Sequence, residues 1–197
     1  MPRPASRTPE QIVDAALHRF WLNGYAATSV DDLVSSTGTT RHAMYQAFGG
    51  KRGLFLACLD AYPAAGVTPA FERVERPGAT VTDIAAFLEH QIAAAEAIGL
   101  PGPGCFYANT MTEVAPHDLE VAERIERHHE RLKQGFLQAL RHSASADISE
   151  AELVRVAELL VVSAQGLWSA SRAVTDAAVL RRAADTLIQL VQRRIGS

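Results

Sequence analysis

The sequence predicts an all-α protein of about nine helices, and three observations lead to that prediction. Alanine occurs 34 times in 197 residues, whereas the β-branched and aromatic residues that favour strands are few. Apolar residues recur at helical spacing in successive segments, and none of these segments is a convincing strand. Clusters of glycine and proline separate the segments from one another.

Four helices are expected in the first 62 residues, over 9–23, 30–36, 41–48 and 51–62. The first helix is expected to start at Thr8-Pro9-Glu10-Gln11. Threonine caps a helix, proline fits its first position, and glutamine can hydrogen-bond back to the cap residue. Thr28 or Ser29 can cap the second helix, and Thr40 can cap the third. Gly38 lies in the short turn between those two.

Five more helices are expected in the remainder, over 80–98, 105–114, 118–142, 149–172 and 176–194. No helix is expected between 63 and 79, because Pro63, the small residues of 64–69 and the Pro77-Gly78 pair all disfavour one. The loop 99–104 is rich in glycine and proline, and Ser149 with Glu152 forms a second capping box.

Composition and charge restrict the class of protein. Cys58 and Cys105 are too few for a disulfide framework, which indicates a reducing compartment. No signal peptide is visible, and no apolar run approaches the eighteen residues of a membrane span, so a cytoplasmic protein with no membrane partner is expected. Residues 1–52 carry a net charge of +2 and residues 53–197 carry −5, which suits an anion-binding domain on a larger acidic one. We therefore expect two domains, 1–52 and 53–197.

The segments 30–36 and 41–48, joined by Thr37-Gly38-Thr39, have the lengths and the glycine-containing turn of a helix-turn-helix. In that motif the second helix enters the major groove of DNA and its N-terminal residues reach base edges. Thr40, Arg41 and His42 occupy those places, and arginine can donate two hydrogen bonds to guanine. Tyr45, one turn further on, and Lys51, at the next helix start, can contact backbone phosphates.

Residues 11–60 resemble the DNA-binding domain of the TetR family of bacterial repressors. The matching positions are Ile12-x-x-Ala15-Ala16-x-x-x-Phe20, Gly24-Tyr25-x-Ala27-Thr28-Ser29-Val30-x-Asp32-Leu33, Gly38, Met44-Tyr45-x-x-Phe48 and Lys51-x-Gly53-Leu54-Phe55. The resemblance implies an all-helical homodimer on a double-stranded operator, with a rear domain whose small-molecule effector weakens DNA binding. The implied DNA contacts fall on Thr28, Thr40, Arg41, His42, Tyr45 and Lys51. The chain departs from the family at His42, commonly a small residue, and at Gly50, commonly a capping side chain.

The rear domain is expected to dimerise through residues 149–194. Leu160, Ala164 and Trp168 belong to an apolar surface wider than one stripe, which a second copy or the protein's own core would cover. An effector cavity is expected among the middle helices, where aromatic and polar side chains mix. Its candidate lining residues are Tyr62, Phe87, Gln91, Phe106, Asn109, Thr110, Glu113, His129 and Trp168.

Other classes of function fit the sequence less well. A metal site at Cys105, Glu113, His128 and His129 lacks ligand spacing, because adjacent histidines on a helix diverge. A helical enzyme using Cys105 or Glu113 would need a nucleophile, base and orienting group that the sequence does not present, and no cofactor loop is visible. A scaffold dimer would use the final helices alone. The favoured function is a ligand-responsive repressor of a palindromic operator, with no catalytic residue, metal or cofactor.

Overall fold

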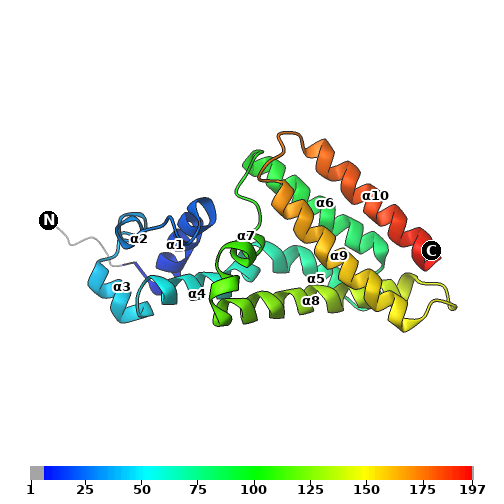
Figure 1. The fold of residues 1–197 in the computed structure, drawn as a ribbon, viewed down its shortest axis with the longest axis horizontal. Coiled ribbons are helices and arrows are strands. Elements are labelled where there is room, and N and C mark those ends of the chain that lie inside the picture. Colours follow the sequence, from blue (N-terminus) through cyan, green and yellow to red (C-terminus); the bar gives the residue numbers. More distant parts are fainter. Residues whose placement is uncertain (1–6, 197) are drawn as a thin grey trace.

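The computed structural model describes residues 7–196, except for the side chains of residues 65 and 66, and this range forms ten α-helices and no strand (Figure 1). The helices are α1 (Pro9–Asn23), α2 (Val30–Thr37), α3 (Arg41–Phe48), α4 (Lys51–Tyr62), α5 (Thr68–Glu75), α6 (Val81–Ile98), α7 (Phe106–Glu113), α8 (Leu119–Ser143), α9 (Glu150–Ala170) and α10 (Ala177–Ile195). A π-helix, Pro63–Val67, follows α4, and a 3-10 turn, Ala115–His117, follows α7. The predicted all-α class is confirmed. Arg3, counted in the charge of the first domain, lies outside the described residues.

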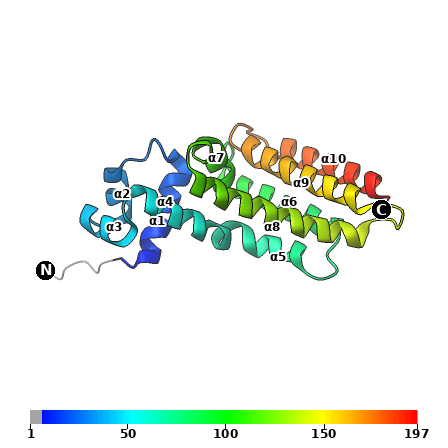
Figure 2. The same cartoon turned by 60° about the horizontal axis from the view of Figure 1, so that its bottom comes forward.

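The helices form a small unit at one end and a longer bundle at the other (Figures 1 and 2). α1, α2 and α3 make the small unit, and α4 runs from it into the bundle. In the bundle α8 packs on α9, and α6 packs on α10. The boundary expected after residue 52 falls in the first turn of α4, so one continuous helix joins the two units.

The small unit is held by local signals that the sequence displays. Thr8 and Ser29 form capping boxes at the starts of α1 and α2. Gly38 ends α2 with φ +64°, the left-handed conformation that favours glycine. A Cβ atom added to Gly53 would lie 1.7 Å from the carbonyl oxygen of Phe48, so only glycine allows α4 to start this close to the end of α3.

The prediction of no helix between residues 63 and 79 was wrong. The chain continues through the π-helix into α5, and Pro63 and Pro69 occupy the first turns of these helices, where proline is tolerated. Phe71 of α5 is fully buried, and its ring meets those of Phe87 and Phe136 edge-on at 5.0 and 5.4 Å. These long-range contacts outweigh the weak local preference for helix.

α9 and α10 carry an outward apolar surface, which we call the α9–α10 face. Its large exposed side chains are Leu159, Val162, Val179 and Leu190. Leu160 and Ala164, which the sequence suggested for pairing with a second copy, are fully buried within this subunit, so they cannot form such a contact. By length and composition α9 would also suffice to cross a membrane, but 44% of its apolar window is buried inside the protein, as in many core helices.

Candidate DNA interface and internal cavity

α3 presents the predicted base-reading residues at the end of the molecule that lies away from the bundle (Figure 1). Met44 is fully buried and fixes the inner side of this helix, whereas Arg41, His42 and Tyr45 are exposed. The Thr40 side chain accepts a hydrogen bond from the backbone N–H of Ala43 at 3.1 Å and so caps the helix start. Thr40 is exposed as well, so all four candidates are accessible to solvent.

Arg41 forms an ion pair with Asp31 of α2, with 2.6 Å between Nη2 and Oδ1. The side chains are 60% and 81% exposed, so water screens the pair and its net contribution to stability is small. A guanine edge or a phosphate could therefore replace Asp31 as the partner of Arg41 at little cost.

Lys51 begins α4, which follows α3 after two glycines. Its Nζ lies 4.3 Å above the centre of the Tyr25 ring, a cation–π contact. Partial burial lowers the pKa of Lys51, and the nearby carboxylate of Glu113 acts in the opposite direction. The ammonium thus lies at a helix start, where an external anion such as phosphate would be stabilised.

Thr28 differs from the other five residues that the resemblance suggested. Its side chain is fully buried, and its hydroxyl donates to the carbonyl oxygen of Gly24 at 2.7 Å. Ser29 takes the helix-capping position, and its hydroxyl and backbone N–H both donate to Asp32. The Thr28 side chain is therefore not accessible to DNA in this structure.

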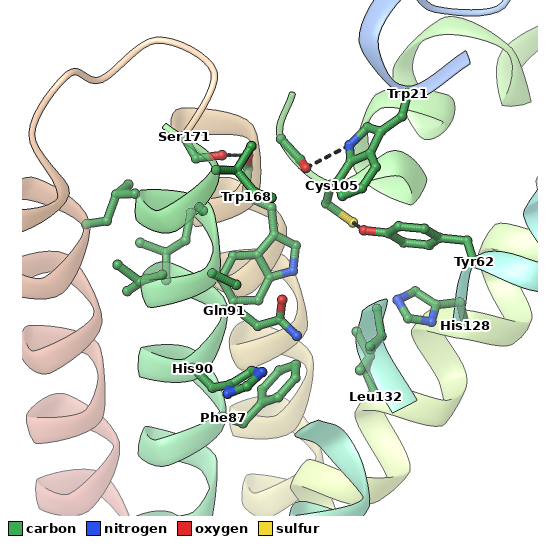
Figure 3. A pocket seen from close by; sticks show the side chains of 18 of the residues that line it. Trp21, Tyr62, Phe87, His90, Gln91, Cys105, His128, Leu132, Trp168 and Ser171 are labelled. Atoms are coloured by element: carbon green, nitrogen blue, oxygen red, sulfur yellow. Dashed lines mark hydrogen bonds between the residues drawn. The ribbon is translucent and has the colours of Figure 1, made fainter. Parts of the chain in front are cut away.

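A cavity of about 390 Å³ lies between the small unit and the bundle (Figure 3). Its wall is formed by Asp14, Leu17, His18, Trp21, Tyr62, Val67, Phe87, His90, Gln91, Ile92, Ala94, Ala95, Ile98, Gly104, Cys105, His128, Leu132, Leu167, Trp168, Ser171 and Leu180. The exposed members of this wall lie on α1 and α6, so the mouth of the cavity opens between these two helices.

Four of the nine predicted lining residues, Tyr62, Phe87, Gln91 and Trp168, lie in this wall. The structure does not bring the other five to it. Four of them lie on α7, whose side chains turn toward neighbouring helices and loops, and the fifth lies on α8. Phe106 packs edge-on against Phe55 and Tyr62, Asn109 donates to the carbonyl oxygen of Pro103, and Thr110 is buried. Glu113 accepts a hydrogen bond from the small unit, and His129 faces Gln165.

Sequence reasoning missed the contribution of α1 to the wall. Leu17 and Trp21 fall within the predicted DNA-binding domain, residues 1–52, and no spacing in the sequence relates them to α6 or α9. His128 and Cys105 also line the cavity, although the sequence suggested His128 only as a metal ligand and Cys105 only as a metal ligand or a reactive group. Among residues 7–196 no group of three or more histidine, cysteine or acidic side chains is arranged to hold a metal ion.

Buried titratable groups in the wall are kept neutral. Burial lowers the pKa of His128 to about 4, with smaller contributions from His129 and Arg131. Burial also raises the pKa of the Cys105 thiol, which accepts a hydrogen bond from the Tyr62 hydroxyl at 3.5 Å. The buried side chains His128 and Cys105 therefore contribute no charge to the inner part of the cavity at neutral pH.

Three sets of polar contacts, which we call the junction contacts, connect the small unit to the bundle. The indole N–H of Trp21 donates to the carbonyl oxygen of Gly104 at 2.9 Å. The Glu113 carboxylate accepts from two backbone N–H groups in the loop after α1. Arg52 donates to both carboxylate oxygens of Asp118, at 2.7 and 2.9 Å, and to Glu120 at 2.9 Å.

Comparison with known proteins relates this arrangement to one family. Residues 12–58 match the description of bacterial regulatory proteins of the TetR family, and residues 80–187 match the tetracyclin repressor-like C-terminal domain. The HTH-type transcriptional regulator YezE of Bacillus subtilis is 30% identical over 131 residues, which are 66% of each chain. The HTH-type transcriptional repressor ComR of Escherichia coli is 28% identical over 196 residues, covering 95% of this chain and 90% of its own.

Solved structures share the fold. A TetR family regulator, CifR, solved as a cysteine mutant with 26-base-pair operator DNA, has a TM-score of 0.80 at 18% identity, covering 96% of this chain and 98% of its own. A regulator from Chloroflexus aurantiacus has a TM-score of 0.78 at 24% identity, with 94% of each chain covered. The two family matches span the small unit and most of the bundle. The chain therefore belongs to the TetR family and is a DNA-binding transcriptional regulator.

Proposed function

We propose that this protein is a repressor that leaves a palindromic operator when a small molecule fills the cavity. The observation that carries this proposal is the shared wall of the cavity. Leu17 and Trp21 come from α1 of the DNA-binding unit, whereas Phe87 and Trp168 come from the bundle. A molecule bound between them would change how α1 lies against the bundle. Two relatives, ComR and BdcR of Escherichia coli, are named repressors, which favours repression over activation.

On the DNA side, α3 would enter the major groove with Arg41 and His42 at base edges. Tyr45 and Lys51 would contact backbone phosphates and so fix the position of the helix. CifR, which shares this fold, was solved with double-strand operator DNA, and this supports DNA binding by a protein of this architecture. A protein that works on chromosomal DNA in this way acts in the bacterial cytoplasm.

The dimer would form through residues 149–194, with the α9–α10 face of one copy against that of the other. Large side chains such as Val162, which is 69% exposed, would be shielded from water there. A twofold dimer presents two α3 helices, and its operator is therefore expected to be palindromic.

The junction contacts would carry the effect of the ligand to α3. Trp21 both lines the cavity and bonds to Gly104, so a molecule that displaces its ring also acts on the junction. A difference of about 1–3 kcal/mol between free and bound conformations would weaken operator binding roughly 5–150-fold. By linkage, the operator must weaken ligand binding by the same factor.

The test is selection of bound sequences from random double-stranded DNA, followed by titration of a labelled winning sequence with small molecules. We expect a palindromic site and at least one compound that both stabilises the protein and releases this DNA. A protein that binds all DNA sequences alike, or whose ligands leave operator affinity unchanged, would contradict the proposal.

A further inference from the structure

We infer that the cavity takes a small uncharged aromatic molecule and rejects carboxylates and phosphates. The inference rests on the proposed function, because it specifies the chemical class of the effector. The cavity volume of about 390 Å³ lies near the lower end of the roughly 300–1,000 Å³ typical of ligand sites, so the molecule is small.

Aromatic rings enclose the space from several sides (Figure 3). Trp21, Tyr62, Phe87 and Trp168 come from α1, α4, α6 and α9. Trp21 meets Tyr62 edge-on with 5.5 Å between ring centres, and Phe87 meets Trp168 edge-on at 6.1 Å. A planar guest in the cavity can stack or pack edge-on against the parts of these rings that line it.

The charge of the wall excludes an anion. No lysine or arginine occurs among its lining residues. The exposed ionisable side chains of the wall are Asp14 and His18 on α1 and His90 on α6, and they stand at the mouth rather than inside the cavity. His128 contributes no charge at neutral pH, since its pKa is lowered to about 4. Arg131 lies near His128, but its guanidinium is bound to both carboxylate oxygens of Glu75 at 2.7 Å. A bound carboxylate would therefore be buried without a cationic partner.

Polar groups in the wall can still orient a neutral guest. The Gln91 amide and the His128 ring extend toward the cavity from α6 and α8, on opposite sides of it (Figure 3). An amide and a neutral imidazole offer both donors and acceptors, which suits a hydroxyl group or a ring nitrogen on the ligand. Neither side chain supplies the positive charge that a carboxylate would require.

A matched pair of probes tests the inference. 2-Naphthol is uncharged at pH 7, whereas 2-naphthoate has the same two rings and one negative charge. We expect isothermal titration calorimetry on the full chain without DNA to give a dissociation constant at least about tenfold lower for 2-naphthol. Equal affinities, tighter binding of 2-naphthoate, or no binding of 2-naphthol would overturn the inference.

A charge introduced into the wall gives a second, independent measurement. Gln91→Lys is expected to raise affinity for 2-naphthoate about tenfold or more, because the anion gains a buried partner. His90→Lys, at the exposed mouth, should also raise the affinity for 2-naphthoate, but by a smaller factor. This variant tests the inference if Gln91→Lys does not fold. Gln134→Lys, on the exposed side of α8 and outside the wall, is the matched control and should change nothing. If the control raised affinity as much as the wall variants, net charge rather than the cavity would explain selectivity, and the inference would fail.

The operator assay separates this inference from the proposed function. If 2-naphthol bound as expected but left operator affinity unchanged, the inferred ligand class would be confirmed and the proposed switch would be wrong. If carboxylates released the operator and neutral aromatics did not, the switch would stand and the ligand class would be wrong.

Discussion

The carboxylate of Glu113, at the end of α7, accepts a hydrogen bond from the backbone N–H of Ala26 at 2.8 Å, although 87 residues separate them along the chain. The N–H of Tyr25 donates to the same carboxylate at 3.0 Å. Both donors lie in the loop between α1 and α2, so one side chain of the bundle fixes the loop that leads into the helix-turn-helix.

Glu113→Gln should loosen this junction. The neutral amide accepts through one oxygen instead of two and lacks the charge that strengthens these bonds. We expect the free energy of unfolding to fall by about 1 kcal/mol in urea denaturation, and operator affinity to change in the same variant. Glu123→Gln, on the exposed side of α8, is the control. Identical behaviour of the two variants would mean that the junction contributes nothing.

Arg41→Ala should relax base preference. If Arg41 donates to a guanine, its loss should reduce the free energy of binding to the selected operator by about 1–3 kcal/mol. Binding to sequences already altered at that base pair should change little. Asp31→Asn, which frees Arg41 from its ion pair, should bind the operator at least as tightly as the natural chain. Fluorescence anisotropy on operators varied one base pair at a time measures both. An equal loss of affinity for all sequences would instead indicate that Arg41 contacts the DNA backbone.

Lys51→Ala should weaken binding to every sequence alike. Each phosphate that the protein no longer neutralises reduces the slope of log affinity against log salt by about one. The matched control is Lys133→Ala, because Lys133 is the only other lysine of the sequence and forms an ion pair with Glu130 on α8. A titration of DNA binding over salt concentration decides the question, and an unchanged slope would exclude Lys51 from phosphate binding.

Gly166→Arg should produce monomers. Nothing lies within 4 Å of a Cβ atom at this exposed position of α9, so the subunit itself has room for the side chain. A second copy packed on the α9–α10 face would meet a buried charge there. Sedimentation velocity should show a dimer for the natural chain and for Leu119→Arg, a control at an 84% exposed leucine of α8 outside that face. A dimer that survived Gly166→Arg would place the interface elsewhere.

Acid should destabilise the protein through His128. Its pKa is about 4 in the folded chain and near 6.5 when unfolded, so between these values the unfolded chain binds a proton that the folded chain does not. The contribution of His128 to the free energy of unfolding is present above pH 6.5 and is lost as the pH falls toward 4. We expect about 2 kcal/mol of that loss between pH 7 and pH 5. His128→Phe, which keeps a ring stacked on Tyr107, should remove this dependence, whereas the exposed His117→Gln should not.

The DNA-binding unit was predictable because its signals are local. Thr8, Ser29 and Thr40 cap the helices that follow them, and Gly38 and Gly49 end the preceding ones in the left-handed conformation. Each of these residues acts on backbone within four positions of itself. Helix boundaries in this region therefore follow from neighbouring residues alone.

α5 and the cavity were not predictable in this way. Phe71 stabilises α5 through rings 16 and 65 residues further along the chain, and the residues between them give no indication of that packing. Trp21 has the spacing of an ordinary core residue of α1, and only the packing of α1 on the bundle makes it part of the wall. The residues of α7 have the composition of a ligand site, but the helix is rotated so that Glu113 faces the loop after α1.

The position of α1 has a consequence for how such regulators can be recombined. A hybrid that carries residues 1–52 of this chain on the body of another family member would take Leu17 and Trp21 away from Phe87 and Trp168. The hybrid would keep the DNA-reading helix but would inherit half of each parent's binding cavity. Under the proposed function, ligand binding and DNA binding in this protein would not be interchangeable modules, and changes in α1 would be selected for both properties at once.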